Sequence, residues 1–305
     1  MHLSEALGGD YQPESTLLAE YAVKDCADLA YELGIPILDR ADYPPVEFRA
    51  DVTNVLAARV GDDGISEAMP EALACYWRGD GVATHVICDK PGARDDSAAK
   101  HILQESAALQ KKLGHYNSAM LHYGGEWYWG VDRLHYLEER LAALGTARDG
   151  AIDTRLASLH QAMDVSLPIK PPAAAAELPP IELFFSFRSP YSHIALFRIA
   201  EIAAAFGLDL VLRPVLPLVM RGVDMPKPKL IYIGMDASRE ASRRGVPFGH
   251  FLDPLGSGVE RCLAVFQYAQ SERRERDFSK SAAVAIWSEG TDLATDEGMR
   301  TVCHR

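Results

Sequence analysis

The chain has 305 residues, of which 48% are apolar, and its formal net charge is −12 at pH 7. This composition supplies enough apolar side chains for one large or two ordinary packed domains, which excludes a disordered chain. The acidic charge opposes a broad nucleic-acid footprint or binding to an anionic membrane surface, because both require clustered lysine and arginine. We therefore expect neither nucleic acid nor membrane as a partner.

Two further features of the sequence bear on its compartment. No segment approaches the roughly 20 unbroken apolar residues that a membrane-spanning helix requires. The opening MHLSEALGGD lacks the basic and apolar regions of a signal peptide. We therefore expect a cytoplasmic protein.

The cysteines are far apart in the sequence, and no two of them form a CxxC motif. A thiol–disulfide oxidant needs a low-pKa thiolate with a resolving partner, and a zinc site needs clustered cysteine or histidine ligands. The sequence therefore predicts no metal site. We expect most of these cysteines to be small buried hydrophobes, with the last as the candidate for exposure: Cys26, Cys75, Cys88, Cys262 and Cys303.

The first hundred residues have mainly helical patterning. Four segments repeat apolar residues every three or four positions, as in an amphipathic helix, and three of them end at a glycine. The predicted helices are Leu17–Gly34, Val46–Val60, Glu71–Gly81 and Ser97–Gly114.

The pattern changes over Ser118–Gly145. Two short strand-like runs flank Gly124 and Gly125, and a helix follows that carries leucines at helical spacing. A hairpin leading into a helix fits this pattern. The leucines expected on one face of that helix are Leu134, Leu137, Leu141 and Leu144.

The stretch from residue 146 to 180 is rich in alanine and proline and is predicted to be a linker. A strand beginning at Ile181 follows it, then a helix that ends near Phe206 and is closed by Gly207. Leu208–Pro217 forms the next predicted strand, and residues 218–305 return to helical patterning. Strand, helix and parallel strand form the βαβ order that opens a thioredoxin fold.

The corner between the first of these strands and its helix carries the chemistry. In IELFFSFRSPYSHIAL (Ile181–Leu196), Ser189 has a residue type suited to a helix N-cap, and Pro190 suits the first helical position. The free N–H groups of a first helical turn bind anions well. Ser189 is thus either a helix cap alone or a cap that also contacts a ligand.

This corner, with Ser189, Pro190, Tyr191 and Ser192, resembles the FxxSPYS corner of one branch of the DsbA-like thioredoxin superfamily. That branch contains 2-hydroxychromene-2-carboxylate isomerases and kappa-class glutathione transferases. The resemblance implies that Ser189 hydrogen-bonds the sulfur of bound glutathione. It also implies that Val131 and Asp132, a small-Asp pair at the start of the predicted last helix of the first module, contact the glutamyl end. The family's cis-proline before the hairpin has no counterpart in Gly114–Met120.

The resemblance implies an α/β, thioredoxin-like (DsbA-type) fold with large helical insertions and two incomplete modules. Residues 1–145 contain an insertion and a closing ββα unit, residues 146–180 the linker, and residues 181–305 an opening βαβ unit and a second insertion. A faint repeat at an offset of about 210 residues aligns Trp77 with Trp287, and we expect both to be core anchors. The chain is either a fragment of a longer tandem protein or builds one composite sheet across the linker.

The function implied is that of a glutathione-dependent isomerase or transferase acting on a small aromatic or conjugated carbonyl substrate. Two alternatives stay open at this point. One is a thiol–disulfide oxidoreductase of the wider DsbA group, which the lack of CxxC opposes, and the other is a catalytically degenerate binding scaffold. Basic residues after the second strand, Arg221, Lys227 and Lys229, are candidates for glutathione carboxylates or for a solvated loop. The sequence also leaves open whether the chain forms a homodimer.

Overall fold

The computed structural model describes residues 15–32, 52, 56, 65–78, 80, 96–115, 119–146, 167 and 178–305. The chain divides into two compact units, Met1–Val165 and Ser166–Arg305, each of which is described by itself. The division falls inside the predicted linker, whose bounds stay a prediction. Within the described ranges, no helix is long and apolar enough to cross a membrane.

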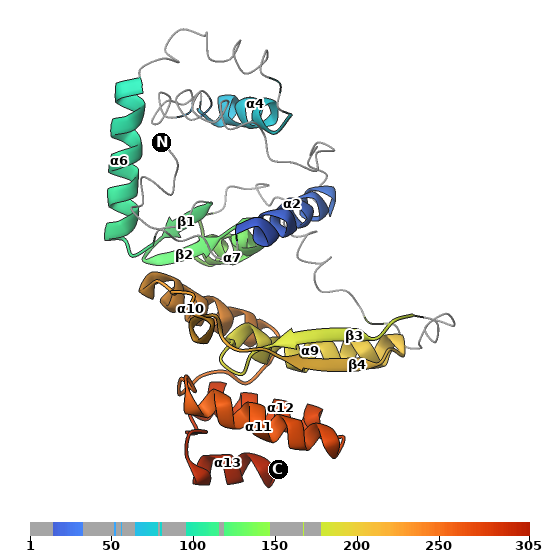
Figure 1. Ribbon diagram of the computed structural model, residues 1–305. Coiled ribbons are helices and arrows are strands. Elements are labelled where there is room, and N and C mark those ends of the chain that lie inside the picture. The colour runs from blue at the N-terminus through green and yellow to red at the C-terminus, as the bar shows by residue number, and fades with distance from the viewer. Residues whose placement is uncertain are drawn as a thin grey trace. The chain divides into compact units, whose positions relative to one another are not determined.

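The first unit combines helices with a two-stranded antiparallel sheet (Figure 1). The predicted helices near residues 17, 71 and 97 are present, whereas most of Val46–Val60 lies outside the described residues. The elements are α2 (Ser15–Glu32), α4 (Ile65–Arg78), α6 (Asp96–Lys112), β1 (Met120–Tyr123), β2 (Glu126–Trp129), the 3-10 helix η1 (Val131–Arg133) and α7 (Leu134–Ala143).

The predicted hairpin is confirmed. β1 pairs antiparallel with β2, and Tyr123 lies opposite Glu126, so Gly124 and Gly125 form a two-residue turn. Their φ angles of 54° and 84° are both positive, as a type I′ turn requires, which explains the two consecutive glycines. Arg140 of α7 donates hydrogen bonds to the carbonyls of Tyr123 (3.0 Å) and Gly124 (3.2 Å), which fastens the turn to the helix.

Helix α4 differs from the sequence prediction in two respects. It begins at Ile65 rather than Glu71, because the helix continues through Pro70 at the loss of one backbone donor. Trp77 was expected in the core and is 45% exposed, so that prediction is wrong. Cys75 is buried, and a step of two residues turns a helix by about 200°, which carries Trp77 to the opposite face.

The second unit opens with the predicted βαβ arrangement. β3 (Ile181–Phe185) pairs in parallel with β4 (Leu210–Pro214), and α9 (Pro190–Phe206) connects them. Gly207 ends α9 in the left-handed conformation (φ 67°), and the Leu208 N–H donates to the carbonyl of Ala203 at 2.9 Å, as in a Schellman motif.

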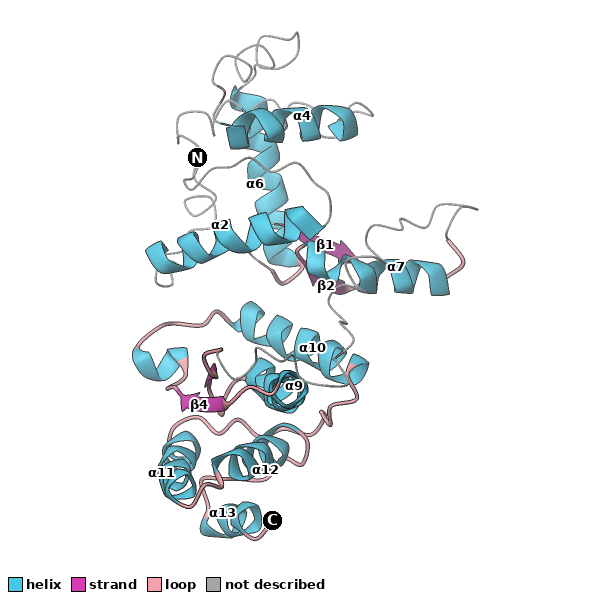
Figure 2. Ribbon diagram, turned by 90° about the vertical axis from the view of Figure 1, so that its right-hand side faces the viewer, coloured by secondary structure: helices cyan, strands magenta, loops and turns pink. Residues whose placement is uncertain are grey.

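Four helices and a 3-10 turn follow β4, as predicted for residues 218–305. Figure 2 shows α10 beside α9, and α11, α12 and α13 grouped together. The elements are η3 (Leu218–Arg221), α10 (Lys227–Arg243), α11 (Ser257–Ser271), α12 (Glu275–Trp287) and α13 (Asp296–Cys303). α9 contacts both α10 and α12, which accounts for its apolar character around most of its circumference.

The core of the second unit lies on one face of the two-stranded sheet. Phe185, Leu210 and Leu212 pack there with side chains of α11 and α12, such as Phe266 and Ile286. Trp287 is 7% exposed and belongs to the same core, which confirms its prediction as an anchor. The other face carries a 2.5 Å ion pair between Glu182 and Arg213 and the exposed ring of Phe184.

Candidate active site at the Ser189 corner

The structure confirms the strand, tight turn and helix predicted around Ser189. The Ser189 N–H donates to the carbonyl of Ser186 (3.0 Å), which closes the turn after β3. Ser189 is extended (φ −100°, ψ 118°), and its Oγ accepts a 3.2 Å hydrogen bond from the Ser192 N–H. Pro190 occupies the first helical position, where no donor is lost. Ser189 is therefore a helix cap, and it is only partly buried.

Two further serines complete the corner. The Ser192 Oγ accepts from the Ser186 N–H (3.1 Å), and the Ser186 Oγ accepts from the Arg188 N–H (3.3 Å). All three hydroxyl oxygens thus act as acceptors for backbone donors. Among the described residues, the Ser189 hydroxyl donates no hydrogen bond, so its proton is available to a ligand.

The field of α9 acts in the same direction as that hydroxyl. Aligned peptide dipoles place partial positive charge at the start of a helix, and a negative ligand there gains typically about 0.3–1 kcal/mol. α9 has 17 residues and begins one residue after Ser189. A thiolate or carboxylate beside the Ser189 hydroxyl would receive both contributions, a hydrogen bond and a favourable dipole.

Arg188, directly before Ser189, fixes the corner from one side. Its guanidinium donates two 2.7 Å hydrogen bonds to the two carboxylate oxygens of Asp253, in the connection between α10 and α11. Bidentate pairs of this kind fix orientation as well as contributing free energy. The Trp287 indole N–H donates to the carbonyl of Phe187 (3.2 Å), which holds the turn from the direction of α12.

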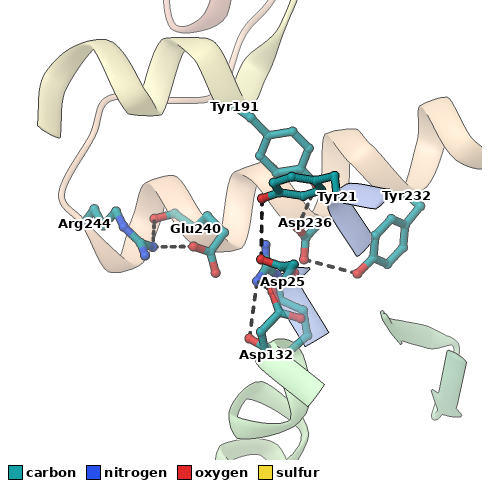
Figure 3. Close-up of polar contacts among 9 residues, drawn as sticks. Tyr21, Asp25, Asp132, Tyr191, Tyr232, Asp236, Glu240 and Arg244 are labelled. Carbon is teal, nitrogen blue, oxygen red and sulfur yellow. Dashed lines mark hydrogen bonds and ion pairs between the residues drawn. The ribbon is translucent and has the colours of Figure 1, made fainter. Parts of the chain in front are cut away.

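Tyr191, two residues after Ser189, is linked to α10. Its hydroxyl donates a 2.7 Å hydrogen bond to Oδ2 of Asp236, and the Tyr232 hydroxyl donates to Oδ1 of the same carboxylate at 3.3 Å (Figure 3). The Asp236 side chain is buried, so these donors compensate the cost of burying its carboxylate. The Tyr191 ring is 37% exposed and thus lies at the surface of the site.

His193, the next residue on the buried side of α9, has a structural role. It is 1% exposed, and its Nε2 lies 2.7 Å from the carbonyl of Pro247, which it can only contact as a donor. Burial lowers the pKa of His193, and the hydrogen bond to Pro247 opposes this shift. His193 is therefore a neutral tether between α9 and the segment after α10.

Val131 and Asp132 belong to the first unit. They lie in η1, directly before α7, where the sequence predicted that helix to begin. The Asp132 carboxylate accepts a 2.7 Å hydrogen bond from Arg133, and its side chain is 37% exposed. A shared site of these residues with Ser189, which belongs to the second unit, stays a prediction.

The basic residues after β4 are spread over two elements. Arg221 ends η3 and is exposed, while Lys227 and Lys229 lie in the first turn of α10. Burial lowers the pKa of Lys229. Their role toward glutathione carboxylates stays a prediction.

The cysteines differ in part from expectation. Cys75 and Cys262 are buried and Cys303 is exposed, as predicted, whereas Cys26 is exposed, like all of residues 24–28 of α2. Cys88 lies outside the described residues. Burial raises the pKa of the Cys262 thiol to about 12. Across the described part of the chain, no group of three or more histidine, cysteine or acidic side chains could hold a metal ion.

A cleft of about 230 Å³ lies among α11, α12 and α13, lined in part by Val265, Phe278 and Cys303. None of the corner residues lines it. The cleft is therefore separate from the Ser189 corner.

Comparison with known families agrees with this architecture. Residues 180–305 match the family model of the DSBA-like thioredoxin domain, over β3, α9, β4 and the helices that follow. No curated protein and no solved structure shows significant similarity to the chain. The match and the mixed helix and strand content together support a thioredoxin-like α/β fold for residues 180–305.

Proposed function

We propose that the protein is a glutathione-dependent isomerase or transferase of the 2-hydroxychromene-2-carboxylate isomerase type, acting on a small aromatic or conjugated carbonyl substrate. The observation that carries the proposal is the Ser189 hydroxyl. Its oxygen caps α9, and its O–H can still donate a hydrogen bond to a ligand. The DSBA-like family includes glutathione-dependent isomerases and transferases as well as oxidoreductases, so the match at residues 180–305 supports this class.

In this proposal Ser189 is the catalytic residue and acts on the sulfur of glutathione. A free thiol has a pKa near 8.5, and a hydroxyl donor together with a helix N-terminus lowers it toward neutrality. Pro190 keeps the first helical turn in place beside the sulfur, and Val131 and Asp132 would contact the glutamyl end. The bound cofactor is thus held as the thiolate, which is the nucleophilic form.

The chemistry needs no nucleophile from the protein. The glutathione thiolate forms a carbon–sulfur bond to the conjugated carbon of the substrate, and the electron pair of the double bond moves onto the carbonyl oxygen. The former double bond can now rotate. Return of the electron pair breaks the carbon–sulfur bond and releases the isomer with the thiolate regenerated. In the transferase variant a leaving group departs instead and the carbon–sulfur bond remains.

The proposal is tested by the binding and ionisation of glutathione. The full chain should be retained on immobilised glutathione. Adding glutathione at pH 7 should produce the thiolate absorbance at about 240 nm. Ser189→Ala should lose that absorbance. Thr295 is a matched control, because its Oγ1 caps α13 by accepting from the Gly298 N–H (3.1 Å), so Thr295→Ala removes a cap away from the corner. A wild-type protein with neither retention nor thiolate absorbance would contradict the proposal.

A further inference from the structure

The connection between α10 and α11 exposes three apolar side chains close together in sequence. We refer to residues Phe248–Leu255 as the 248–255 segment. Phe251 is 54% exposed, Leu252 43% and Leu255 48%. Exposing apolar area costs roughly 25 cal/mol per Å², so three such side chains in one short segment call for an explanation.

This exposure does not come from a loosely held loop. The Gly249 N–H donates to the carbonyl of Trp287 (3.0 Å), and the Leu252 N–H donates to the carbonyl of Ile286 (3.2 Å). These bonds fix the backbone of the 248–255 segment to the end of α12. The exposed apolar side chains are therefore carried by a backbone that is held in place.

The 248–255 segment lies beside the Ser189 corner. Asp253, between Leu252 and Leu255 in the chain, accepts both hydrogen bonds of the bidentate pair with Arg188, the residue before Ser189. The Asp253 Oδ1 also accepts from the Leu255 N–H (3.1 Å), which orients the exposed leucine. The only carboxylate of the segment is thus engaged by Arg188 and by the backbone. The exposed apolar side chains Phe251, Leu252 and Leu255 flank it in the chain, together with the exposed His250.

The aromatic side chains extend this surface into the core. The Phe251 ring lies 5.5 Å from the Trp287 ring at an interplanar angle of 33°, and Phe248 stacks on Trp287 at 5.9 Å and 12°. Trp287 also holds the turn through its hydrogen bond to the carbonyl of Phe187. A flat aromatic ligand on the exposed face of Phe251 would continue this series of rings.

We infer that the 248–255 segment is the wall that receives the electrophilic second substrate, with Phe251, Leu252 and Leu255 contacting the aromatic part of that molecule. The inference rests on the proposed function, since the glutathione thiolate at Ser189 must meet its acceptor at this corner. Asp253 is a positioning residue that holds the wall beside the thiolate through Arg188.

The backbone of the segment favours a small molecule over an extended peptide as the occupant. Extended peptides are recognised largely by main-chain hydrogen bonds to a free edge. Here Gly249, Leu252 and Leu255 spend their N–H groups within the chain, and His250 forms a parallel bridge with Glu289. What remains is side-chain surface, which suits a compact aromatic ligand.

The first test measures binding of an apolar aromatic probe, 1-anilinonaphthalene-8-sulfonate, by fluorescence, without glutathione. Leu252→Ser and Leu255→Ser should each raise its Kd about ten-fold. Ile231→Ser is the matched control, because Ile231 is a 54% exposed apolar side chain on α10, outside the segment and outside the cleft among α11, α12 and α13, and its Kd should equal that of wild type. Unchanged binding in both leucine variants, or no binding by wild type, would overturn the inference.

A second pair of variants tests the positioning role. Asp253→Asn keeps an acceptor for the Leu255 N–H but removes the charge that pairs with Arg188, so the probe's Kd should rise about five-fold. Glu182→Gln is the control, since it removes the exposed ion pair with Arg213 on the sheet. Equal affinities of Asp253→Asn and wild type would remove Asp253 from this role. Melting curves of each variant verify folding.

The kinetic test uses glutathione with 1-chloro-2,4-dinitrobenzene, in which the thiolate sulfur bonds to the ring carbon and chloride leaves with its electron pair. Leu252→Ser should raise KM for the electrophile about ten-fold and leave KM for glutathione unchanged. An equal rise in both KM values would contradict the inference. Absence of glutathione binding in wild type would defeat the proposed function together with the second-substrate role that rests on it. The probe-binding test does not use glutathione, so it decides separately whether the segment binds an aromatic molecule. Displacement of the probe by a reduced, unfolded polypeptide but not by dinitrobenzene compounds would favour a peptide site instead.

Discussion

Tyr191, two residues after Ser189, donates a 2.7 Å hydrogen bond to Asp236, a carboxylate on α10 that is 1% exposed (Figure 3). The pair joins the first turn of α9 to the middle of α10 across 45 residues of sequence. The geometry of the corner therefore depends on a buried carboxylate in another helix.

Replacing Tyr191 by Phe should destabilise the protein, because Asp236 loses the shorter of its two hydrogen bonds from tyrosine hydroxyls. Hydrogen bonds to charged groups contribute about 1.5–3 kcal/mol, and an urea titration of the full chain should show a loss of that order. Tyr232→Phe removes a 3.3 Å bond to the same carboxylate and should cost less. A larger loss for Tyr232→Phe than for Tyr191→Phe would reverse our ranking of the two bonds.

Substitution of Ser189 separates its capping role from its proposed role toward the thiolate. Ser189→Ala should lower stability by about 0.5–2 kcal/mol, and Ser189→Asp should recover that loss because aspartate also caps helices. The Asp variant nevertheless places negative charge where the thiolate must lie, so it should leave the pKa of glutathione high and the activity absent. A thermal melt beside a pH titration of thiolate absorbance measures both effects. Full activity of Ser189→Asp would exclude Ser189 from catalysis.

The buried thiol of Cys262 should make stability depend on pH in the alkaline range. Its pKa is raised to about 12 by burial, so between about pH 9 and pH 12 the folded chain keeps a proton that the unfolded chain releases. The contribution of Cys262 to the free energy of unfolding is fully present below pH 9. It is lost as the pH rises, with a limiting slope of about 1.4 kcal/mol per pH unit. The free energies of unfolding of wild type and of Cys262→Ala, measured from pH 8 to 11, should depend on pH with different slopes. Parallel slopes would contradict the assignment.

The same burial predicts unequal thiol reactivity. At pH 8 an aromatic disulfide reagent should modify the exposed Cys303 rapidly, Cys26 more slowly because partial burial raises its pKa, and Cys262 only after unfolding. Mass spectrometry of peptides identifies the modified residues.

His193 should make stability depend on pH in the acidic range, with the opposite sign. Its pKa is lowered by burial, so below about pH 6.5 His193 becomes protonated in the unfolded chain but stays neutral in the folded chain. The contribution of His193 to the free energy of unfolding is fully present above pH 6.5 and is lost as the pH falls through the lowered pKa. His193→Gln keeps a donor for the carbonyl of Pro247 and should remove this component. Identical acid profiles for the two proteins would show that His193 does not titrate on unfolding.

The elements predicted correctly from the sequence are those defined by neighbouring residues. Ser189 and Pro190 start α9 and Gly207 ends it, and Gly124 with Gly125 defines the hairpin turn. Each of these depends on local backbone preferences that a short sequence window contains. The same reasoning does not extend to Trp77, because a single helical pattern does not identify which face of a helix the rest of the chain covers.

The surroundings of the corner could not be predicted in this way. Arg188 meets Asp253 across 65 residues, and Tyr191 meets Asp236 across 45. Neither acidic residue belongs to a motif, and surface charges are common, so nothing in the sequence distinguishes them from their neighbours. Their importance arises from the packing of α10 and the 248–255 segment against the corner.

The hydrogen bond from the Trp287 indole to the carbonyl of Phe187 spans 100 residues. During synthesis the corner leaves the ribosome long before its partner, and at about 5–20 residues per second the delay is roughly 5–20 s. For that interval β3 and the start of α9 lack the indole that holds their turn and much of the core that covers the sheet. The newly made corner would thus expose apolar surface that chaperones can bind, before it is complete enough to bind the proposed glutathione.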